Sequence, residues 1–565
     1  MSLTSFERLW QTGRKPPERA FPEFGHRLER VTRDIVCERD LAIPMRDGVK
    51  LYADVFRPVS GAAVPALLTW SPYGKHAPQR YERYYQNGGV LPQWLSKYSV
   101  FEGPDPLAWV PRGYAVVHVD SRGTWRSEGE AAFLDRAEGR DGYDAVEFIA
   151  AQSWCTGRVG LAGVSYLATV QWQIAATRPP HLAAINVWEG ASDLYREFFL
   201  HGGIPETSFV PRWNANRLNN SLTRVEDLAA MVRAHPLWDA YWETKRAQLS
   251  NIDVPAYIVA SWSDQGLHTR GTLEGFREIG SREKWLEIHG RKKWQYYHQP
   301  ASVEKQRRFF DQFLRGVPGR VQRWPSVLIE VRERFYKGRF RAEREWPLAR
   351  TQYRPLYLGA GTGRMKTAPY IARTSVSYEA PGDGTRSPAS YGAHRAEFGY
   401  RFARATELTG HMKLKLWVEA EGSTDMDLFV AIQKFDRAGR HVGFPVYNAF
   451  EDGPIAMGWL RVSHRELDAA SSTPWQPRLL HRRRQMLKPR QIVPVEIEIW
   501  PSSTRFAAGE WLRVAVQGSD IYTYPGAGYG HTETVNRGRH IIHTGGRFDS
   551  HLLVPVIPSR VQAKP

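Results

Sequence analysis

The residues around Ser165 have the types and spacing that a serine nucleophile requires. Ser165 comes after a short apolar run, 159–162, that predicts a buried strand, and it directly precedes a helical pattern, 166–177. A sharp turn between a strand and a helix exposes the serine hydroxyl and frees the next backbone N–H for an oxyanion, but it needs small neighbours. Gly163 and Ala168 are small, although Leu167 stands where the pattern G-x-S-x-G has its second glycine. The pattern predicts a nucleophile at Ser165; the alternative is a serine that caps the helix.

Two later strand ends carry the other side chains that such a serine needs. Hydrolases with this kind of turn order their triad as Ser, then Asp or Glu, then His. The apolar run 254–261 is followed by Asp264, and the run 284–288 ends in His289. We therefore predict Asp264 as the acid and His289 as the base.

Other histidines compete with His289 for this role. His268 is only four residues from Asp264, which we expect to be too close to reach the site from a neighbouring strand. His298, in the segment Tyr296-Tyr297-His298-Gln299, is the main rival. A third alternative is that His289 merely ends its strand with its ring satisfied by backbone groups.

The elements that must position these residues alternate between strands and helices. Residues 35–43 and 49–56 predict a hairpin that turns at Asp47-Gly48. Buried strands are predicted at 64–70, 114–120 and 159–162, with a helix at 141–152; strands 254–261 and 284–289 bracket a helix at 269–279. Such alternation is typical of an α/β fold with a parallel sheet.

Two other regions differ from this pattern. Residues 193–251 are rich in aromatic residues, arginine and helix formers, which predicts a helical cap over the site. From about residue 321 onward the pattern is one of short strands without helices, at 326–331, 412–419, 427–434, 493–499, 511–516 and 550–557. Short strands separated by Gly and Pro turns predict a β-sandwich or jelly roll.

The composition excludes several classes of protein. The formal charge of +18 would suit nucleic acid, but the arginines are dispersed and the one tight run, 482–484, lies in no recognisable nucleic-acid module, so we expect no nucleic-acid partner. Cys37 and Cys155 are expected to be buried thiols. Residues 1–15 lack the apolar core of a signal peptide and no stretch predicts a membrane span, so we expect a cytoplasmic protein with no membrane partner. The sequence allows a homo-oligomer without requiring one.

Several motifs together resemble one family of hydrolases over almost the whole chain. The chain resembles the family of cocaine esterase, α-amino-acid ester hydrolases and X-prolyl dipeptidyl peptidases. The motifs that carry the resemblance are Ile43 to Val49, Ser71 to Lys75, Asp120 to Gly123, Gly163 to Leu167, Gly202 to Ile204, Thr409 to His411, Gly458 to Arg461, and Gly545-Gly546 with Asp549-Ser550.

The resemblance implies an α/β-hydrolase core, a helical cap and a C-terminal jelly-roll domain. We expect a leader at 1–34, the core at 35–192 and 252–320, the cap at 193–251 and the jelly roll at 321–565. It also implies that the hydroxyl of Tyr73 and the backbone N–H of Tyr166 form the oxyanion hole. No cofactor or metal is expected.

The chain departs from the family at two places. Ala168 stands where many members have glycine, which should only tighten the packing of the turn. Cocaine esterase carries its histidine in a Pro-Trp-Ser-His segment, whereas this chain has Ile288-His289-Gly290-Arg291-Lys292-Lys293-Trp294. The second departure bears directly on which histidine is the base.

These features predict a serine hydrolase that cleaves carboxylic esters of small molecules. An X-Pro dipeptidyl peptidase or amino-acid ester or amide hydrolase is the alternative, with an ammonium-binding set drawn from Glu189, Asp193, Glu197 and Glu206. A non-catalytic carbohydrate-binding protein is a third reading. The insertion favours an aryl or apolar substrate that is neutral or anionic. Its aromatic residues and arginines are Phe198, Phe199, Phe209, Trp213, Trp238, Trp242, Arg196, Arg212, Arg217, Arg224 and Arg233.

Overall fold

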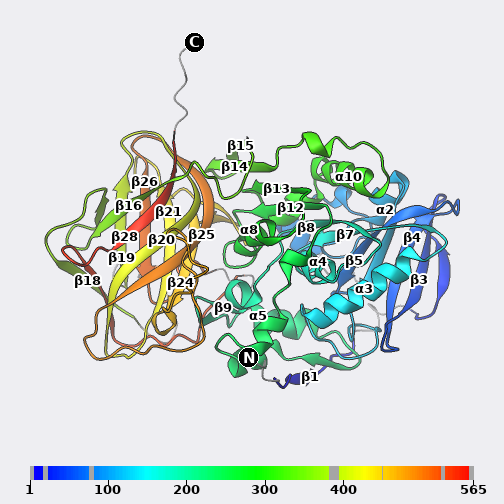
Figure 1. The fold of residues 1–565 in the computed structure, drawn as a ribbon, viewed down its shortest axis with the longest axis horizontal. Helices are drawn as coiled ribbons and strands as arrows, with labels where there is room; N and C mark the ends of the chain where they lie inside the picture. Colours follow the sequence, from blue (N-terminus) through cyan, green and yellow to red (C-terminus); the bar gives the residue numbers. More distant parts are fainter. Residues whose placement is uncertain are drawn as a thin grey trace, which may run out of the picture.

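A computed structural model describes residues 6–16, 23–75, 82–380, 394–447, 449–523 and 528–558. The described chain forms two bodies that lie side by side along the long axis of the molecule (Figure 1). The first contains a mainly parallel sheet covered by helices, and the second consists mostly of strands. Both cysteines are free and buried, as predicted. Within the described residues, no helix has the length and apolar character needed to cross a membrane.

The central sheet of the first body runs in the order β3, β4, β6, β5, β7, β8, β12, β13, β14, β15. The strands from β6 to β14 are parallel, so their carboxyl ends meet at one edge. The strand bounds are β3 Ile35–Pro44, β4 Lys50–Pro58, β5 Val64–Ser71, β6 Ala115–Asp120, β7 Cys155–Val164, β8 Leu182–Trp188, β12 Ala256–Ser261, β13 Lys284–His289, β14 Val327–Arg334 and β15 Lys337–Glu343. The predicted hairpin is confirmed, with Gly48 in the left-handed region at φ 85°.

Helices cover both faces of this sheet. On one face lie α3 (Arg136–Ala150), α4 (Tyr166–Ala176) and α8 (Thr269–Glu278). On the other lie α2 (Pro106–Trp109) and α10 (Pro300–Leu314). Successive residues of β7 alternate between the two cores, with Leu161 on the α4 side and Ala162 and Val164 on the α10 side. Burial on both faces explains why these strands are apolar runs.

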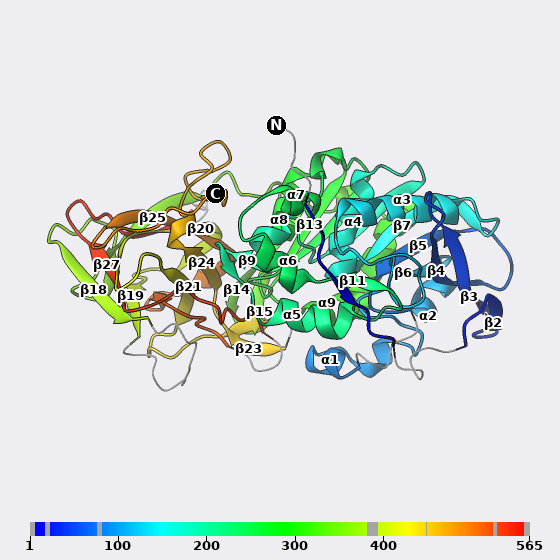
Figure 2. The ribbon, with the colours of Figure 1, turned by 90° about the horizontal axis from the view of Figure 1, so that it is seen from below.

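The segment between β8 and β12 consists of short elements near the carboxyl edge of the sheet. They are η5 Tyr195–Phe199, β9 Leu200–His201, β10 Ile204–Pro205, α5 Phe209–Trp213, η6 Asn214–Leu218, β11 Arg224–Glu226, α6 Leu228–Ala234, α7 Ala240–Thr244 and η7 Leu249–Asn251. Part of the N-terminal leader is tied to them, because β1 (Trp10–Thr12) pairs with β11 (Figure 2). A second leader strand, β2 (Arg27–Arg30), pairs with β3.

The second body is built of antiparallel strands. Its strands are β16 Gln352–Gly359, β17 Arg364–Lys366, β18 Thr374–Glu379, β19 Arg395–Arg401, β20 Thr406–Glu421, β21 Asp427–Phe435, β22 Phe444–Val446, β23 Phe450–Gly453, β24 Ala456–Arg461, β25 Val493–Phe506, β26 Trp511–Gln517, β27 Arg539–Thr544 and β28 His551–Ile557. The long strand β20 pairs with β25, β27 and β28, while β21 pairs with β24 and β26. Apolar side chains of both groups share one core. Strand β14, which the sequence placed with this body, instead extends the parallel sheet by pairing with β13.

Hydrogen bonds tie the second body to the loop that follows β12. The side chain of Gln265 donates to the carbonyl of Pro501 at 3.1 Å and accepts from the N–H of Met457 at 3.2 Å. The N–H of Tyr447 donates to the carbonyl of Ser263. Both bodies therefore fix the position of this loop.

Candidate active site

Ser165 sits at a strained turn between β7 and α4. Its backbone has φ 61° and ψ −114°, a conformation that non-glycine residues rarely adopt and that is typical of functional sites. A Cβ atom at Gly163 would lie 2.4 Å from the Cβ of Leu167, so only glycine fits there. The Ser165 side chain makes no capping hydrogen bond to α4. The geometry of this turn therefore suits a nucleophile and not a helix cap.

The histidine beside Ser165 is His268. Its Nε2 atom lies 3.3 Å from the Oγ atom of Ser165, and its Nδ1 atom lies 2.5 Å from Oδ2 of Asp264. His268 and Asp264 are both buried. With the Nδ1 proton donated to Asp264, the unprotonated Nε2 atom faces the serine hydroxyl, which is the arrangement of a serine, base and acid triad.

A single helical turn makes this arrangement possible. The N–H of His268 donates to the carbonyl of Asp264 at 3.2 Å, and the next residue begins α8. Side chains four residues apart lie on the same face of such a turn. The short sequence separation that argued against His268 is thus what brings it to Asp264.

The structure does not bring His289 to Ser165, which corrects the predicted arrangement. His289 is the last residue of β13 and pairs in register with Ser261, so it lies within the sheet rather than in the loop beyond it. Its ring stacks on Tyr296 at 4.0 Å, its Nδ1 atom accepts the N–H of Arg291, and its Nε2 atom lies 3.3 Å from Glu189. Burial lowers its pKa to about 3, so it is neutral.

His298, the main rival for the role of base, is also buried, and no contact between it and Ser165 is described. It lies at the end of α9 (Lys293–His298), where its ring packs edge-on against Tyr85 at 5.0 Å. Burial lowers its pKa to about 3. Its surroundings are those of a packed aromatic ring.

The two predicted oxyanion donors lie beside the nucleophile. Tyr73 lines the same pocket as Ser165, and its hydroxyl accepts a hydrogen bond from Nε1 of Trp213 at 3.2 Å. Tyr166 is the first residue of α4, a position whose N–H has no partner within the helix. The phenol of Tyr166 serves a different purpose, since it donates to the buried carboxyl of Glu138 at 2.7 Å.

A buried cluster of charged groups surrounds the acid. Lys293, the first residue of α9, places its Nζ atom 3.1 Å from Oδ2 of Asp264 and 3.5 Å from Nδ1 of His268. Burial would raise the pKa of Asp264, but Lys293 and His268 outweigh it and hold that pKa well below its usual range. Burial and the positive charge of Lys293 lower the pKa of His268 to about 4, so His268 is neutral at pH 7.

Two further carboxyl groups face this cluster. Glu189 follows β8, and burial together with the negative charge of Asp264 raises its pKa well above the usual range, so it is protonated and neutral. Glu102 has a left-handed backbone at φ 66°, and its Oε1 atom accepts from Nε1 of Trp294 at 2.9 Å. Burial raises its pKa to about 7, partly offset by Lys293.

Ser165 opens into a hollow of about 780 Å³ that both bodies line. Eight of its 18 lining residues are aromatic: Tyr73, Tyr84, Phe101, Phe209, Trp213, Trp294, Tyr447 and Phe450. Its charged lining residues are Glu102 and the four cations Arg83, Arg212, Arg217 and Lys293. The predicted arginines Arg212 and Arg217 therefore reach the pocket, whereas Arg196 pairs with Asp193 and Arg224 pairs with Glu130.

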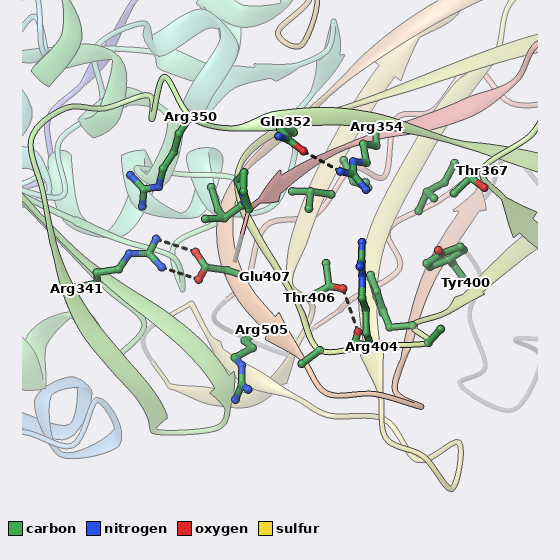
Figure 3. A pocket seen from close by; sticks show the side chains of 18 residues that line it. Arg341, Arg350, Gln352, Arg354, Thr367, Tyr400, Arg404, Thr406, Glu407 and Arg505 are labelled. Carbon is green, nitrogen blue, oxygen red and sulfur yellow. Dashed lines mark hydrogen bonds and ion pairs between the residues drawn. The ribbon is translucent and has the colours of Figure 1, made fainter. Parts of the chain in front are cut away.

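A second hollow, of about 640 Å³, lies between β15 and the second body and is lined by five arginines (Figure 3). Arg341 forms a two-pronged ion pair with Glu407, and Arg350 pairs with Glu343. No serine or histidine lines it. This hollow therefore gathers part of the excess positive charge, and it lacks the serine and histidine found at Ser165.

The chain and its fold have counterparts among known proteins. The family model for X-Pro dipeptidyl-peptidase (S15 family) matches residues 47–294, and the model for the X-Pro dipeptidyl-peptidase C-terminal non-catalytic domain matches residues 319–553. A solved CocE/NonD family hydrolase from Staphylococcus aureus is 41% identical, with a TM-score of 0.88 over 94% of this chain and 96% of that one. The chain belongs to the CocE/NonD family of hydrolases.

Other relatives of this CocE/NonD hydrolase are more distant. Cocaine esterase from a Rhodococcus species is 28% identical over 412 residues, which cover 62% of this chain and 66% of that enzyme, just under two thirds of its length. A solved α-amino-acid ester hydrolase shares the fold at 16% identity, with a TM-score of 0.71 over 96% of this chain and 99% of that one.

The structure shows what the segment that differs from cocaine esterase does at the site. In this CocE/NonD hydrolase, residues 288–294 bring a lysine, Lys293, to the acid, and the histidine comes from the loop after β12. The sequence signal for His268 was the spacing Asp-x-x-x-His directly before a helix. The described residues contain no cluster of three or more His, Cys, Asp or Glu that could hold a metal ion.

Proposed function

We propose that this protein is a serine esterase that hydrolyses small carboxylic esters through an acyl-enzyme on Ser165. The observation that carries the proposal is the chain of contacts from Ser165 to His268 at 3.3 Å and from His268 to Asp264 at 2.5 Å, at a strained strand-to-helix turn. Family membership supports it, since relatives are named as esterases and ester hydrolases.

In the proposed mechanism, His268 removes the proton of Ser165 as Ser165 attacks the acyl carbon. Asp264 holds the ring of His268 in the required tautomer and stabilises its charged form. The hydroxyl of Tyr73 and the N–H of Tyr166 bind the oxyanion, a contribution of about 3–4 kcal/mol for one such donor. His268 then protonates the leaving alcohol, and water repeats the sequence on the acyl-enzyme.

The proposed domain division follows the sequence expectation with one change. We propose an α/β-hydrolase core at 35–192 and 252–320, a cap at 193–251 and a jelly-roll domain in the C-terminal part. Strands β14 and β15 belong to the core sheet by their pairing, so the jelly roll begins after Glu343.

An ester substrate fits the pocket better than an X-Pro peptide does. A dipeptidyl peptidase must bind a charged N-terminus, and the acidic residues considered for that task do not line the described pocket: Glu189, Asp193, Glu197 and Glu206. Asp193 pairs with Arg196, Glu197 with Arg270, and Glu206 accepts backbone N–H groups. The aromatic wall with four cations instead suits an aryl group that is neutral or anionic.

Covalent labelling by a fluorophosphonate tests the proposal. The wild-type protein should label on one serine, and Ser165→Ala should fold normally but lose both labelling and nearly all ester turnover. Ser153→Ala is the matched control, because Ser153 is exposed in the turn between α3 and β7, at the opposite end of β7 from Ser165. Labelling of Ser165→Ala at wild-type stoichiometry would show that the nucleophile is elsewhere.

A further inference from the structure

We propose that Lys293 is a positioning residue of this site: its ammonium group holds the Asp264 carboxylate in place for His268 and keeps His268 uncharged by electrostatic repulsion. This inference rests on the proposed roles of Ser165 and His268. It adds a fourth side chain to the site, one that does not itself react.

The burial of Lys293 is the first observation behind this proposal. Its side chain is only 2% exposed, and lysine is almost never found so deeply buried unless it is paired. The only direct hydrogen bond described for its ammonium group to a carboxylate is the one to Asp264, at 3.1 Å. Lys293 is therefore a buried lysine whose paired carboxylate belongs to the proposed acid of the triad.

The shared oxygen atom explains how Lys293 positions the acid. Oδ2 of Asp264 accepts from both Lys293 and His268. The Nδ1–H of His268 and the ammonium approach the same oxygen, which fixes the carboxylate at the angle that the imidazole needs. Without the lysine, one of the two hydrogen bonds that orient this oxygen is lost.

The surrounding charges explain why a cation is needed there. Burial opposes a charge on Lys293, but the carboxyl groups of Asp264, Glu189 at the end of β8 and Glu102 in the loop before α2 outweigh burial and raise its pKa, so Lys293 is charged at neutral pH. Three buried carboxyl groups this close together cannot all be ionised, because like charges repel strongly at low dielectric. Lys293 favours the ionised form of Asp264. The remaining titratable neighbours of Asp264 are the neutral His289 and the phenols of Tyr447 and Tyr529.

The charge of Lys293 also acts on His268. The ammonium lies 3.5 Å from Nδ1 of His268, so a proton added to the ring would face a positive charge at contact distance. Only the neutral ring can act as base. Lys293 therefore extends the pH range of activity towards acid.

The test is the pH dependence of the fluorophosphonate labelling rate in Lys293→Met, Lys293→Gln and Lys293→Arg. Loss of the charge should move the acid midpoint of labelling upward by about 1–3 pH units in the Met and Gln variants. Lys293→Arg keeps the charge and should stay near the wild-type midpoint. Lys292→Met is the matched control, since Lys292 pairs with the exposed Glu451 and should leave the midpoint unchanged.

Several results would overturn the proposal. Equal midpoints in Lys293→Met and the wild-type protein would remove the electrostatic role while leaving Ser165 as the nucleophile. If the neutral variants do not fold, the wild-type protein alone tests the proposal. An acid midpoint of labelling near 6.5, the ordinary pKa of histidine, would remove the electrostatic role of Lys293. Labelling that survives in His268→Ala but vanishes at every pH in Lys293→Met would make Lys293 the base. Absence of labelling in the wild-type protein would overturn the proposed function itself, and this inference with it.

Discussion

Asp264 and His268 share one helical turn, which places Nδ1 of the histidine 2.5 Å from Oδ2 of the aspartate. The acid and the proposed base therefore come from a single loop after β12, and their mutual geometry depends on that loop alone. The segment after the neighbouring strand β13 supplies Lys293, the first residue of α9, instead of a histidine. Ser165, on β7, approaches this pair from two strands away in the sheet.

The oxyanion hole gives the first prediction. Tyr73→Phe should lower kcat by about 10²–10³-fold while KM stays within a few-fold, because the hydroxyl donates mainly to the transition state. Steady-state kinetics on a p-nitrophenyl ester measure both. Tyr143→Phe, a change of the same kind on α3, should leave kcat unchanged. An effect of Tyr73→Phe on KM alone would reduce Tyr73 to a wall of the pocket.

The carboxyl group of Glu102 gives a prediction about pH. With its pKa raised to about 7 by burial, Glu102 is neutral below pH 7 and becomes an anion above it. A negative charge in the pocket of Ser165 opposes the oxyanion, so kcat/KM should fall as pH rises through about 7. Glu102→Gln should remove this alkaline decline. A decline that persists unchanged in Glu102→Gln would assign it to another group.

The contact between the two bodies gives a prediction about stability. Gln265→Ala should lower the thermal unfolding midpoint, because it leaves the buried carbonyl of Pro501 and N–H of Met457 unpaired, at a cost of about 1–3 kcal/mol for each such group. The loop that carries Asp264 should loosen, and kcat should fall with it. Gln248→Ala, at an exposed glutamine, is the control. A variant as stable and active as the wild type would show that the second body does not support this loop.

The lining of the pocket predicts the class of substrate. We expect kcat/KM for aryl or short-chain p-nitrophenyl esters to exceed that for Ala-Pro-p-nitroanilide by at least about 10²-fold, or about 2.7 kcal/mol in transition-state binding. The reason is that the pocket offers aromatic rings and four cations but no set of carboxylates for a charged N-terminus. Comparable efficiencies on the two substrates would favour the peptidase.

The sequence predicted most strands of the core sheet, because strands buried on both faces are apolar runs, but it missed β8 and β15 of that sheet. It also missed β16, β18, β19 and β27, whose outward positions carry arginine, serine and histidine and interrupt the apolar pattern. Strand β14 was assigned to the wrong body, since nothing in its sequence distinguishes a parallel partner from an antiparallel one.

At the site, the sequence predicted Ser165, Asp264, Tyr73 and Tyr166, which the structure brings to one region, but it did not predict His268, the histidine that lies between Ser165 and Asp264. Strand ends are readable from sequence, so His289 was expected at the carboxyl edge. The register of β13, which pairs His289 with Ser261, keeps its ring inside the sheet and is set by contacts that no local pattern contains. The roles of Lys293 and Glu102 depend on distances between separate loops, which only the folded chain shows.

The most direct test of the account compares His268→Ala with His289→Ala. The measurement is the rate of fluorophosphonate labelling of Ser165 at neutral pH, with folding verified by circular dichroism. We expect His268→Ala to lose labelling and ester turnover to the level of Ser165→Ala, and His289→Ala to keep most of both, with reduced stability because Glu189 and Tyr296 lose a packed neighbour. Labelling that is retained in His268→Ala and lost in His289→Ala would contradict the account and return the base to β13.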